Sequence, residues 1–265
     1  MKKSNAMREI HFITPNWPAP SNVRALQTTR NGGVSRAPYA SLNLGAHVND
    51  DALAVAKNRQ LLSRYLPREP VWINQVHGVA VIDAAQSTCL QNADASFTTQ
   101  PKVVCVTMTA ECLTVLLCDK AGTVVASIHS GWRSLCDGII EATVMKMPAK
   151  TTDLMAWLGP AIGPQTFEVG GEVRAQFIAK DAQAALAFTP QPSNYSNDKY
   201  LANIYQIATQ RLNNLGITQI YGATFHEADD ENHRGYFCTY TDEAQFFSFR
   251  RDNVTGRMAS LIWLE

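Results

Sequence analysis

The sequence predicts an α+β fold built on a mixed β-sheet. Three runs of β-branched and aliphatic residues follow one another closely, at residues 102–108, 113–119 and 123–129, which is typical of buried strands. Helical periodicity occurs elsewhere, but strands and helices do not alternate strictly, as they do in a Rossmann fold. The chain also lacks the glycine-rich signatures of dinucleotide and P-loop sites, so a nucleotide-binding fold is not indicated.

The first half of the chain carries two further elements. Residues 50–66 place apolar residues at helical spacing behind Asp50 and Asp51, whose charges suit a helix N-terminus, so we predict a helix. Residues 71–83 form two β-rich runs around His77 and Gly78. We interpret them as a hairpin or bulge that places His77 at the end of a strand.

The second half alternates helices and strands less regularly. Residues 130–147 switch to a helical period directly after the third strand, and "LMAWLGPAIG" reads as a strand that ends in a Gly/Pro turn. Further helices are predicted at 171–186 and 199–215, and strands within 216–225 and 257–264. Residues 1–6 resemble an expression-tag remnant, and residues 7–265 are expected to form a single domain.

Composition excludes several classes of function. The 23 basic and 23 acidic residues give a net charge of zero, and no basic run offers a footprint for nucleic acid. No apolar stretch is long enough for a membrane span, and no signal peptide is visible. Six cysteines without Cys-X-X-Cys spacing indicate reduced thiols. We therefore expect a cytoplasmic protein without nucleic-acid or membrane partners.

Three chemically competent residues fall at predicted strand ends. His77, Cys112 and His129 are separated by 35 and 17 residues, which matches no zinc finger or ribbon and argues against a structural site. Two histidines and a thiolate with an open fourth position would suit a catalytic metal. The same residues also permit a nucleophilic thiolate with a histidine base, or a buried core thiol.

Two local features favour function. His129 precedes Ser130, Gly131, Trp132 and Arg133 where a strand gives way to a helix, and free N–H groups at a helix start can bind an anion. Gly78, which follows His77, permits close approach of backbone or ligand.

Seven motifs occur in order between Thr28 and Leu264, and together they resemble the bacterial laccase-domain (multicopper polyphenol oxidase type) proteins, now regarded as purine nucleoside phosphorylases. The motifs are "TTRNGGVSRAPYASLNLGAHVNDD", "NQVHG", "TAECLTVLLCD", "IHSGWRSL", "LGPAIGPQTFEVG", "CTYTDEAQFFSFRRD" and "TGRMASLIWL". They span nearly the whole chain, so residues 7–265 are expected to form one laccase-domain-type catalytic domain.

The resemblance implies a mononuclear metal site, usually zinc, with ligands at His77, Cys112 and His129. It implies sheets packed face to face with outer helices, a four-layer α/β/β/α sandwich related to cysteine-hydrolase toxins. It also implies phosphorolysis of adenosine, inosine and methylthioadenosine, together with adenosine deamination. Copper is not favoured, because a multicopper oxidase needs many histidines in His-X-His pairs and this chain has six histidines without such a pair.

The sequence departs from the family pattern at several positions. Glu111 and Thr114 stand where the family usually has aspartate and proline. The longer Glu111 side chain displaces the carboxylate, which can slow turnover strongly, so Glu111→Asp is expected to raise it. Residues 226–237 resemble an insertion. Its His226, Glu227, Asp229, Asp230 and His233 are the right residue types for a second metal, but a solvated acidic loop is the preferred interpretation.

Cleavage of an N-glycosidic bond requires an anionic nucleophile near C1′ and an acid or Lewis acid near the purine. Glu111 and Cys112 are the candidate catalytic residues. The candidates for binding phosphate or substrate are Arg30, Asn43, Arg133 and Arg250, since the planar guanidinium suits phosphate. An ion-pair role is preferred for one of Arg250 and Arg251, and Asn43 is equally suited to a turn.

The preferred function is a zinc-dependent, monomeric nucleoside phosphorylase that acts on purine nucleosides and phosphate. The alternative is an amidase-like hydrolase with Cys112 as nucleophile, acting on a cell-wall precursor. A binding module without activity is disfavoured by the clustering of reactive residues.

Overall fold

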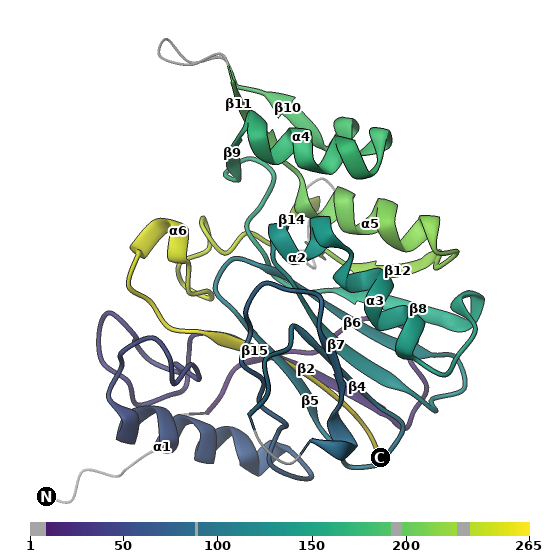
Figure 1. Ribbon diagram of the computed structural model, residues 1–265. Coiled ribbons are helices and arrows are strands. Elements are labelled where there is room, and N and C mark those ends of the chain that lie inside the picture. The colour runs from purple at the N-terminus through teal and green to yellow at the C-terminus, as the bar shows by residue number, and fades with distance from the viewer. Residues whose placement is uncertain (1–8, 88–89, 192–197, 227–233) are drawn as a thin grey trace, which may run out of the picture.

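Two β-sheets packed against each other organise the chain in the computed structural model, which describes residues 9–87, 90–191, 198–226 and 234–265 (Figure 1). The smaller sheet has the strand order β1 (Phe12–Ile13), β2 (Val23–Thr28), β15 (Met258–Leu264), β5 (Cys105–Thr109). The larger sheet has the order β12 (Gln219–Gly222), β8 (Leu154–Leu158), β6 (Leu113–Asp119), β7 (Val125–Ser130), β4 (Ala95–Thr98), β3 (Val81–Asp83).

The larger sheet is mixed, as the sequence predicts. Strands β6 and β7 pair antiparallel, whereas β12 runs parallel to β8 and β3 runs parallel to β4. The three runs predicted as buried strands form β5, β6 and β7, and every residue of these strands is buried. The prediction of an α+β fold is therefore confirmed.

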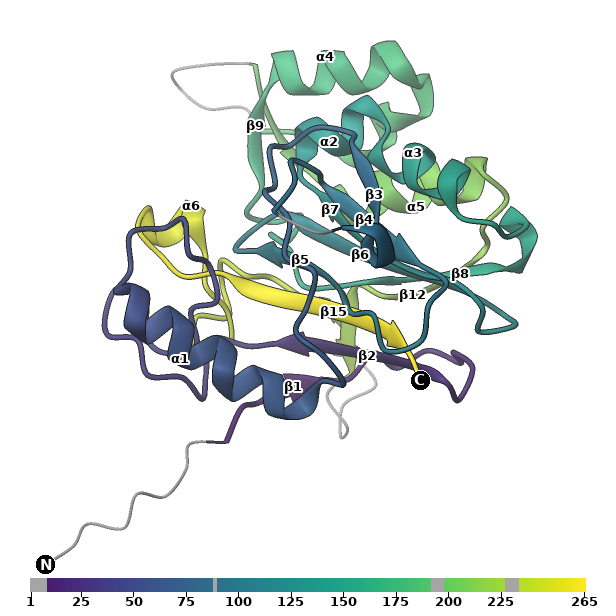
Figure 2. The same cartoon turned by 60° about the horizontal axis from the view of Figure 1, so that its bottom comes forward.

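Three apolar clusters hold these elements together. One cluster lies between the two sheets and includes Cys105, Leu116, Trp157 and Ile262. A second cluster joins the other face of the larger sheet to four helices, and a third joins the other face of the smaller sheet to one helix (Figure 2). The helices of the second cluster are α2 (Trp132–Asp137), α3 (Ile139–Lys146), α4 (Gly171–Lys180) and α5 (Ile204–Asn214), and that of the third is α1 (Ala52–Leu62).

Three smaller elements lie outside the two sheets and the five helices that pack on them. A three-stranded sheet has the order β10 (Phe188–Pro190), β11 (Lys199–Ala202), β9 (Glu168–Gly170). A β-ribbon pairs β13 (Thr224–His226) with β14 (Arg234–Tyr236), and α6 (Phe249–Asp252) is a single short turn. No helix in the described part of the chain is long and apolar enough to cross a bilayer.

A row of buried hydroxyls runs between the two sheets. Thr107 Oγ1 of β5 lies 2.8 Å from Ser127 Oγ of β7 and 3.4 Å from Thr114 Oγ1 of β6. Ser127 Oγ also donates to the carbonyl of Ser260. Because buried hydroxyls without partners are costly, these bonds favour one relative placement of the two sheets.

Several element boundaries differ from the sequence predictions. The helix of residues 50–66 forms α1 plus a 3₁₀ turn at Ser63–Tyr65, with the Asp51 side chain accepting the Leu53 N–H as N-cap. The helix predicted at residues 171–186 ends at Lys180, and a separate 3₁₀ helix at Ala182–Ala187 follows the extended Asp181. The helix of residues 199–215 begins only at Ile204, because its first residues pair with β9 and β10 as strand β11.

Two predictions were wrong in kind. His77 does not end a strand: it lies in a loop with φ 60°, and β3 begins only at Val81. The single helix of residues 130–147 is broken at Gly138, whose φ of 96° ends α2 before α3 begins. The second-metal residues proposed at Glu227, Asp229, Asp230 and His233 lie outside the described residues, as does the side chain of His226.

The left-handed conformation of Gly138 yields a stability prediction. A Cβ at this position meets open space apart from the Glu141 side chain, so the cost of Gly138→Ala comes from backbone strain. We expect Gly138→Ala to lower the free energy of unfolding by about 1–2 kcal/mol, and Gly138→Asn to lower it less, because asparagine tolerates this region. Urea unfolding measures both, and an alanine variant as stable as the parent would contradict the assignment.

Candidate metal centre

His77, Cys112 and His129 converge on one point although they come from three separate segments. Their ligand atoms, one from each residue, all lie within 4.8 Å of one another. The Cys112 Sγ lies 3.8 Å from His77 Nε2, and the two imidazole rings meet edge to face with centroids 4.8 Å apart. His129 is buried, Cys112 is half-buried and His77 is exposed, so the cluster opens to solvent on the His77 side.

The strand pairing explains why Cys112 meets His129. The bend formed by Ala110, Glu111 and Cys112 carries the chain from β5 in the smaller sheet to β6 in the larger one. The β6–β7 register pairs Leu113 with Ser130 and Thr114 with His129. Cys112 therefore lies at the open end of the pair, next to Gly131.

Gly131 leaves the space in which the cluster forms. A Cβ on this residue would lie 2.8 Å from His77 Cδ2 and 3.1 Å from Cys112 Sγ. Both distances are shorter than carbon and sulfur atoms normally adopt. Any larger residue would push His77 and Cys112 apart, so the glycine in "HSGW" has a packing role.

The carboxylate of Asp94 joins two of the three residues. Asp94 is fully buried, and its Oδ1 lies 2.7 Å from His129 Nδ1. The same carboxylate accepts the backbone N–H groups of His77 and Gly78 at 2.9 and 2.6 Å. Because Nδ1 of His129 faces Asp94, its Nε2 is left to face the cluster.

The loop that carries His77 is also attached to the smaller sheet. Gln75 Nε2 donates to the carbonyl of Met108, and Gln75 Oε1 accepts the Met108 N–H. The Gln75 side chain thus bonds both backbone groups of Met108, as a neighbouring strand would. These bonds fix the loop that leads to His77. The positive φ of His77 is held by these bonds and by those to Asp94.

The electrostatics of the cluster favour a thiolate beside a charged imidazole. Burial raises the pKa of Cys112, but the His129 and His77 imidazoles lower it to about 6. Burial lowers the pKa of His129, but Cys112 and Asp94 raise it to about 9. Burial also opposes the ionised form of Asp94, yet the bond to His129 and the N–H donors keep its pKa below the usual value. Such a thiolate is a metal ligand or a nucleophile.

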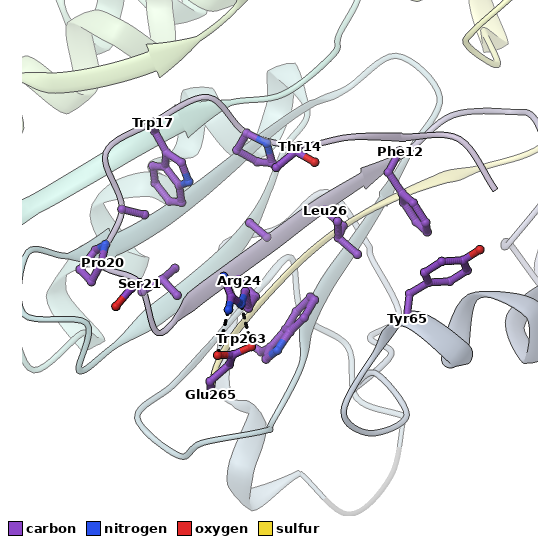
Figure 3. Close-up of a pocket in the computed structure, with 14 residues that line it drawn as sticks. Phe12, Thr14, Trp17, Pro20, Ser21, Arg24, Leu26, Tyr65, Trp263 and Glu265 are labelled. Atoms are coloured by element: carbon purple, nitrogen blue, oxygen red, sulfur yellow. Dashed lines mark hydrogen bonds and ion pairs between the residues drawn. The ribbon is translucent and has the colours of Figure 1, made fainter. Parts of the chain in front are cut away.

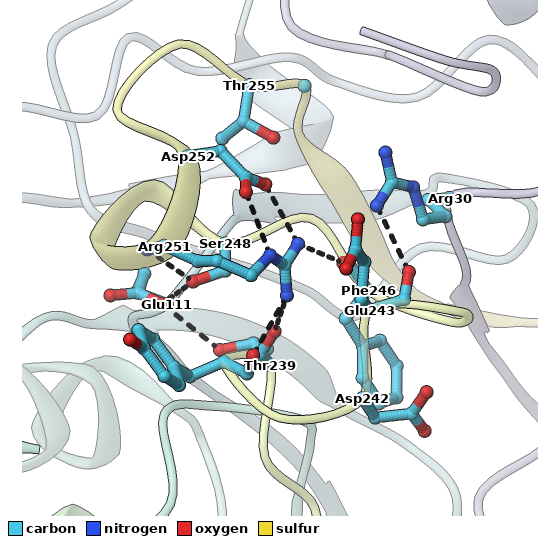
Figure 4. A network of polar contacts seen from close by, with 12 residues as sticks. Arg30, Glu111, Thr239, Asp242, Glu243, Phe246, Ser248, Arg251, Asp252 and Thr255 are labelled. Carbon is cyan, nitrogen blue, oxygen red and sulfur yellow. Dashed lines mark hydrogen bonds and ion pairs between the residues drawn. The ribbon is translucent and has the colours of Figure 1, made fainter. Parts of the chain in front are cut away.

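The Glu111 carboxylate contacts residues of the C-terminal segment (Figure 4). Its Oε1 accepts from the Ser248 hydroxyl at 2.5 Å and from the Thr239 hydroxyl at 3.4 Å. Burial raises the pKa of Glu111, while Ser248 and the Arg250 N–H oppose this. The carboxylate is thus next to Cys112 in sequence but anchored on a different segment.

Arg30 and Asn43, which the sequence predicts as phosphate or substrate ligands, make hydrogen bonds within the protein. Arg30 donates to the carbonyl of Glu243 (Figure 4) and to that of Ala40, and its guanidinium lies 4.8 Å from the centre of the Phe247 ring. Asn43 is fully buried. Its Oδ1 accepts from Gly45 and Arg257, and its Nδ2 donates to Asp50.

The remaining predicted arginines differ in exposure. Arg133 is exposed and stacks on Trp132, with 4.3 Å between its Cζ and the ring centre. Arg250 is exposed and donates to the carbonyl of Glu168. Arg251 pairs with Asp252 at 2.8 Å and donates to three backbone carbonyls, those of Thr239, Tyr240 and Phe246 (Figure 4). These contacts of Arg251 stabilise the conformation of the C-terminal loop.

Sequence reasoning missed two residues of this site. Asp94 belongs to none of the seven motifs, and only the structure shows that it contacts both histidine segments. Arg257 lies within "TGRMASLIWL", so a signal was present, but nothing in the spacing separates it from the other arginines. Its guanidinium lies close enough to Cys112 and Glu111 for both to raise its pKa, although burial has the larger effect and lowers it.

A cavity of about 510 Å³ lies elsewhere, against the smaller sheet (Figure 3). Phe12, Trp17, Tyr65 and Trp263 line it together with the Arg24–Glu265 ion pair. Trp263 and Glu265 are at the C-terminal end of β15, whereas the metal cluster lies beside its N-terminal end. None of the predicted site residues lines this cavity.

Comparison with known proteins agrees with the motif pattern. A purine nucleoside phosphorylase of Haemophilus influenzae is 52% identical over 258 residues, which cover 97% of this chain and 100% of that protein. The purine nucleoside phosphorylase YfiH of Escherichia coli is 50% identical over 256 residues, covering 96% and 98%. The crystal structure of Neisseria meningitidis protein NMB0706 superposes with a TM-score of 0.86 at 44% identity, covering 96% and 99%.

The family model described as multi-copper polyphenol oxidoreductase laccase matches residues 24–265. With these relatives along almost its whole length, the chain belongs to the multi-copper polyphenol oxidoreductase laccase family.

Proposed function

We propose that this chain is a zinc-dependent purine nucleoside phosphorylase whose metal ligands are His77, Cys112 and His129. The observation that carries the proposal is the convergence of these three side chains on one point, with His129 bonded to the buried Asp94 carboxylate. Relatives that are about half identical over their full length carry the name purine nucleoside phosphorylase. Adenosine deamination and methylthioadenosine phosphorolysis at the same site are part of the proposal.

The donor set fits a zinc ion. Two imidazoles and one thiolate are ligands that zinc accepts in a tetrahedral site, with the fourth position left for water or substrate. The 3.8 Å between Cys112 Sγ and His77 Nε2 matches the separation of two ligands on one tetrahedral ion. The Asp94–His129 bond is the outer contact that commonly orients such a histidine. The small number of histidines favours zinc over copper.

The residues of the site have separate roles in glycosidic cleavage. When bound, zinc would supply Lewis acidity to the reacting groups. His77, on the exposed side of the cluster, lies where a ligand enters, while Asp94 keeps His129 in one tautomer. Glu111 is placed to hold or release a proton through its bond with Ser248. Arg133 and Arg250 offer exposed cations for phosphate.

A second function is favoured by the lowered pKa of Cys112. A thiolate beside a protonated histidine that is oriented by an aspartate has the make-up of a cysteine hydrolase. In that case Cys112 would attack a carbonyl carbon and His129 would protonate the leaving group. An amide of a cell-wall precursor is the substrate class proposed for this alternative.

The domain organisation, the layered architecture, the oligomeric state, the location and the partners expected from the sequence are also part of the proposal. Residues 7–265 form a single catalytic domain, arranged as a four-layer α/β/β/α sandwich related to the cysteine-hydrolase toxins. The protein acts as a cytoplasmic monomer on purine nucleosides and phosphate, without nucleic-acid or membrane partners.

The variant Cys112→Ser separates the two functions. If Cys112 is a ligand, the variant loses both zinc and phosphorolysis, because a hydroxyl binds zinc far more weakly than a thiolate, and a chelator has the same effect on the parent. Elemental analysis and a nucleoside assay with and without phosphate measure this. A variant that loses turnover but keeps stoichiometric zinc would identify a nucleophile instead.

The variant Asp94→Asn tests the support of the metal site. The amide removes the charge that orients His129, so we expect zinc affinity to fall by about 10–100-fold, as measured by competition with a chromogenic chelator. Asp119→Asn is the matched control, since Asp119 is also a buried carboxylate with N–H donors but lies at the opposite end of β6. Equal zinc affinity in the two variants would rule out the role of Asp94.

The contacts of Glu111 reverse the expectation drawn from the sequence for Glu111→Asp. A shorter side chain withdraws the carboxylate from Ser248. We therefore expect kcat to fall by roughly 10–100-fold while zinc content stays constant. Glu111→Gln keeps the length and shows how much of the loss comes from charge. An increase in kcat for Glu111→Asp would show that the family's aspartate geometry is the better one here.

A further inference from the structure

Arg257 lies beside the metal cluster although it is more than a hundred residues away in sequence. It directly precedes β15, whose first residue, Met258, pairs with Thr109 at the end of β5. The antiparallel register therefore places Arg257 next to the bend of Ala110, Glu111 and Cys112. Cys112 and Glu111 are close enough to raise the pKa of Arg257, which agrees with this placement, although burial has the larger effect and lowers it.

The loop of residues 43–45 holds Arg257 in place. Asn43 Oδ1 accepts the Arg257 N–H at 2.9 Å, and the Leu44 N–H donates to the Arg257 carbonyl at 3.1 Å. The Arg257 side chain also packs closely on Gly45, where a Cβ would lie 2.8 Å from Arg257 Cγ. The buried Asn43 thus has the role of a positioning residue for Arg257.

Among the described residues, the guanidinium of Arg257 has hydrogen-bond partners for only some of its N–H groups. The side chain is half-buried, and its Nη1 donates to the carbonyls of Thr255 and Gly256. No carboxylate in the described ranges lies within ion-pair distance of it, and its Nε and Nη2 make no hydrogen bond to those ranges. Neutral carbonyls on one edge and free N–H groups on the other leave the guanidinium able to bind an oxyanion in a forked geometry.

The other arginines near the site are less suited. Arg30 and Arg251 use their N–H groups on backbone carbonyls, and Arg251 also pairs with Asp252. Arg133 and Arg250 are exposed, so water competes for any anion that they bind. A half-buried cation binds an anion more strongly, because the local dielectric constant is lower. His47 adds a second polar group beside Arg257, with a pKa lowered by burial and by the two arginines Arg257 and Arg59.

We propose that Arg257, positioned by Asn43, binds the inorganic phosphate that attacks the nucleoside, and that Arg133 and Arg250 are outer contacts. This inference rests on the proposed function. In the reaction, a phosphate oxygen forms a bond to C1′ while the bond from C1′ to the purine nitrogen breaks. The electron pair of that bond leaves with the purine, which takes up the proton of hydrogen phosphate. The products are the free purine and ribose 1-phosphate, and nothing is oxidised or reduced.

The test is steady-state phosphorolysis of inosine by the zinc-loaded protein, with phosphate and inosine varied separately. For Arg257→Gln we expect the KM for phosphate to rise by on the order of tenfold or more, with the KM for inosine and the zinc content within about twofold of the parent. Arg257→Lys keeps the charge and should recover part of the loss. Arg24→Gln is the control, because Arg24 pairs with Glu265 on the outer side of the smaller sheet. A phosphate KM that is unchanged in Arg257→Gln would overturn the proposal.

A binding measurement makes the test independent of turnover. Inorganic phosphate alone should raise the Tm of the parent and of Arg24→Gln but not of Arg257→Gln. If phosphate stabilises the parent through Arg257 but no nucleoside is cleaved, the proposed function fails and the oxyanion site stands. If nucleosides are cleaved and the stabilisation is equal in all variants, the oxyanion site fails alone. Stronger stabilisation by adenosine 5′-monophosphate than by phosphate, lost in Arg257→Gln, would identify a nucleotide phosphate instead and contradict the proposal.

Discussion

The buried carboxylate of Asp94 is the interaction on which the rest of the site depends. It lies 2.7 Å from His129 Nδ1 and accepts the N–H groups of His77 and Gly78. One side chain therefore fixes a histidine on a rigid strand and a histidine in a loop relative to each other. A fully buried carboxylate is stable only when such donors satisfy it. These donors therefore hold the segments of His77 and His129 together around the carboxylate.

The packing of the two sheets against each other determines the position of Cys112. The bend that carries Cys112 crosses from the smaller sheet to the larger one, so the position of the thiol depends on how the sheets pack. The hydroxyls of Thr107 and Ser127 favour one placement of the sheets. Gln75 attaches the His77 loop to β5, and Arg257 enters from β15 on the same side. Groups from both sheets thus surround one open point, as catalysis by positioning requires.

Part of the fold was predictable from local signals in the sequence. The apolar runs that form β5, β6 and β7 and the helical pattern of α1 are visible in the sequence, because burial and side-chain spacing are local properties. The loop conformation of His77 was not predicted, because it depends on a contact with the distant Asp94. The break at Gly138 was not predicted, because the helical period continues across this left-handed glycine. Asp94 and Arg257 act through pairings between distant segments, which one sequence without structure does not reveal.

X-ray absorption at the zinc edge, on protein purified without chelator, tests directly whether Cys112 and two histidines bind the zinc ion. The proposed ligands predict one sulfur at about 2.3 Å and two imidazole nitrogens at about 2.0–2.1 Å from each zinc ion, with the sulfur contribution absent in Cys112→Ser. A zinc spectrum without sulfur, or a protein that purifies without stoichiometric metal and still cleaves nucleosides, would contradict these zinc ligands.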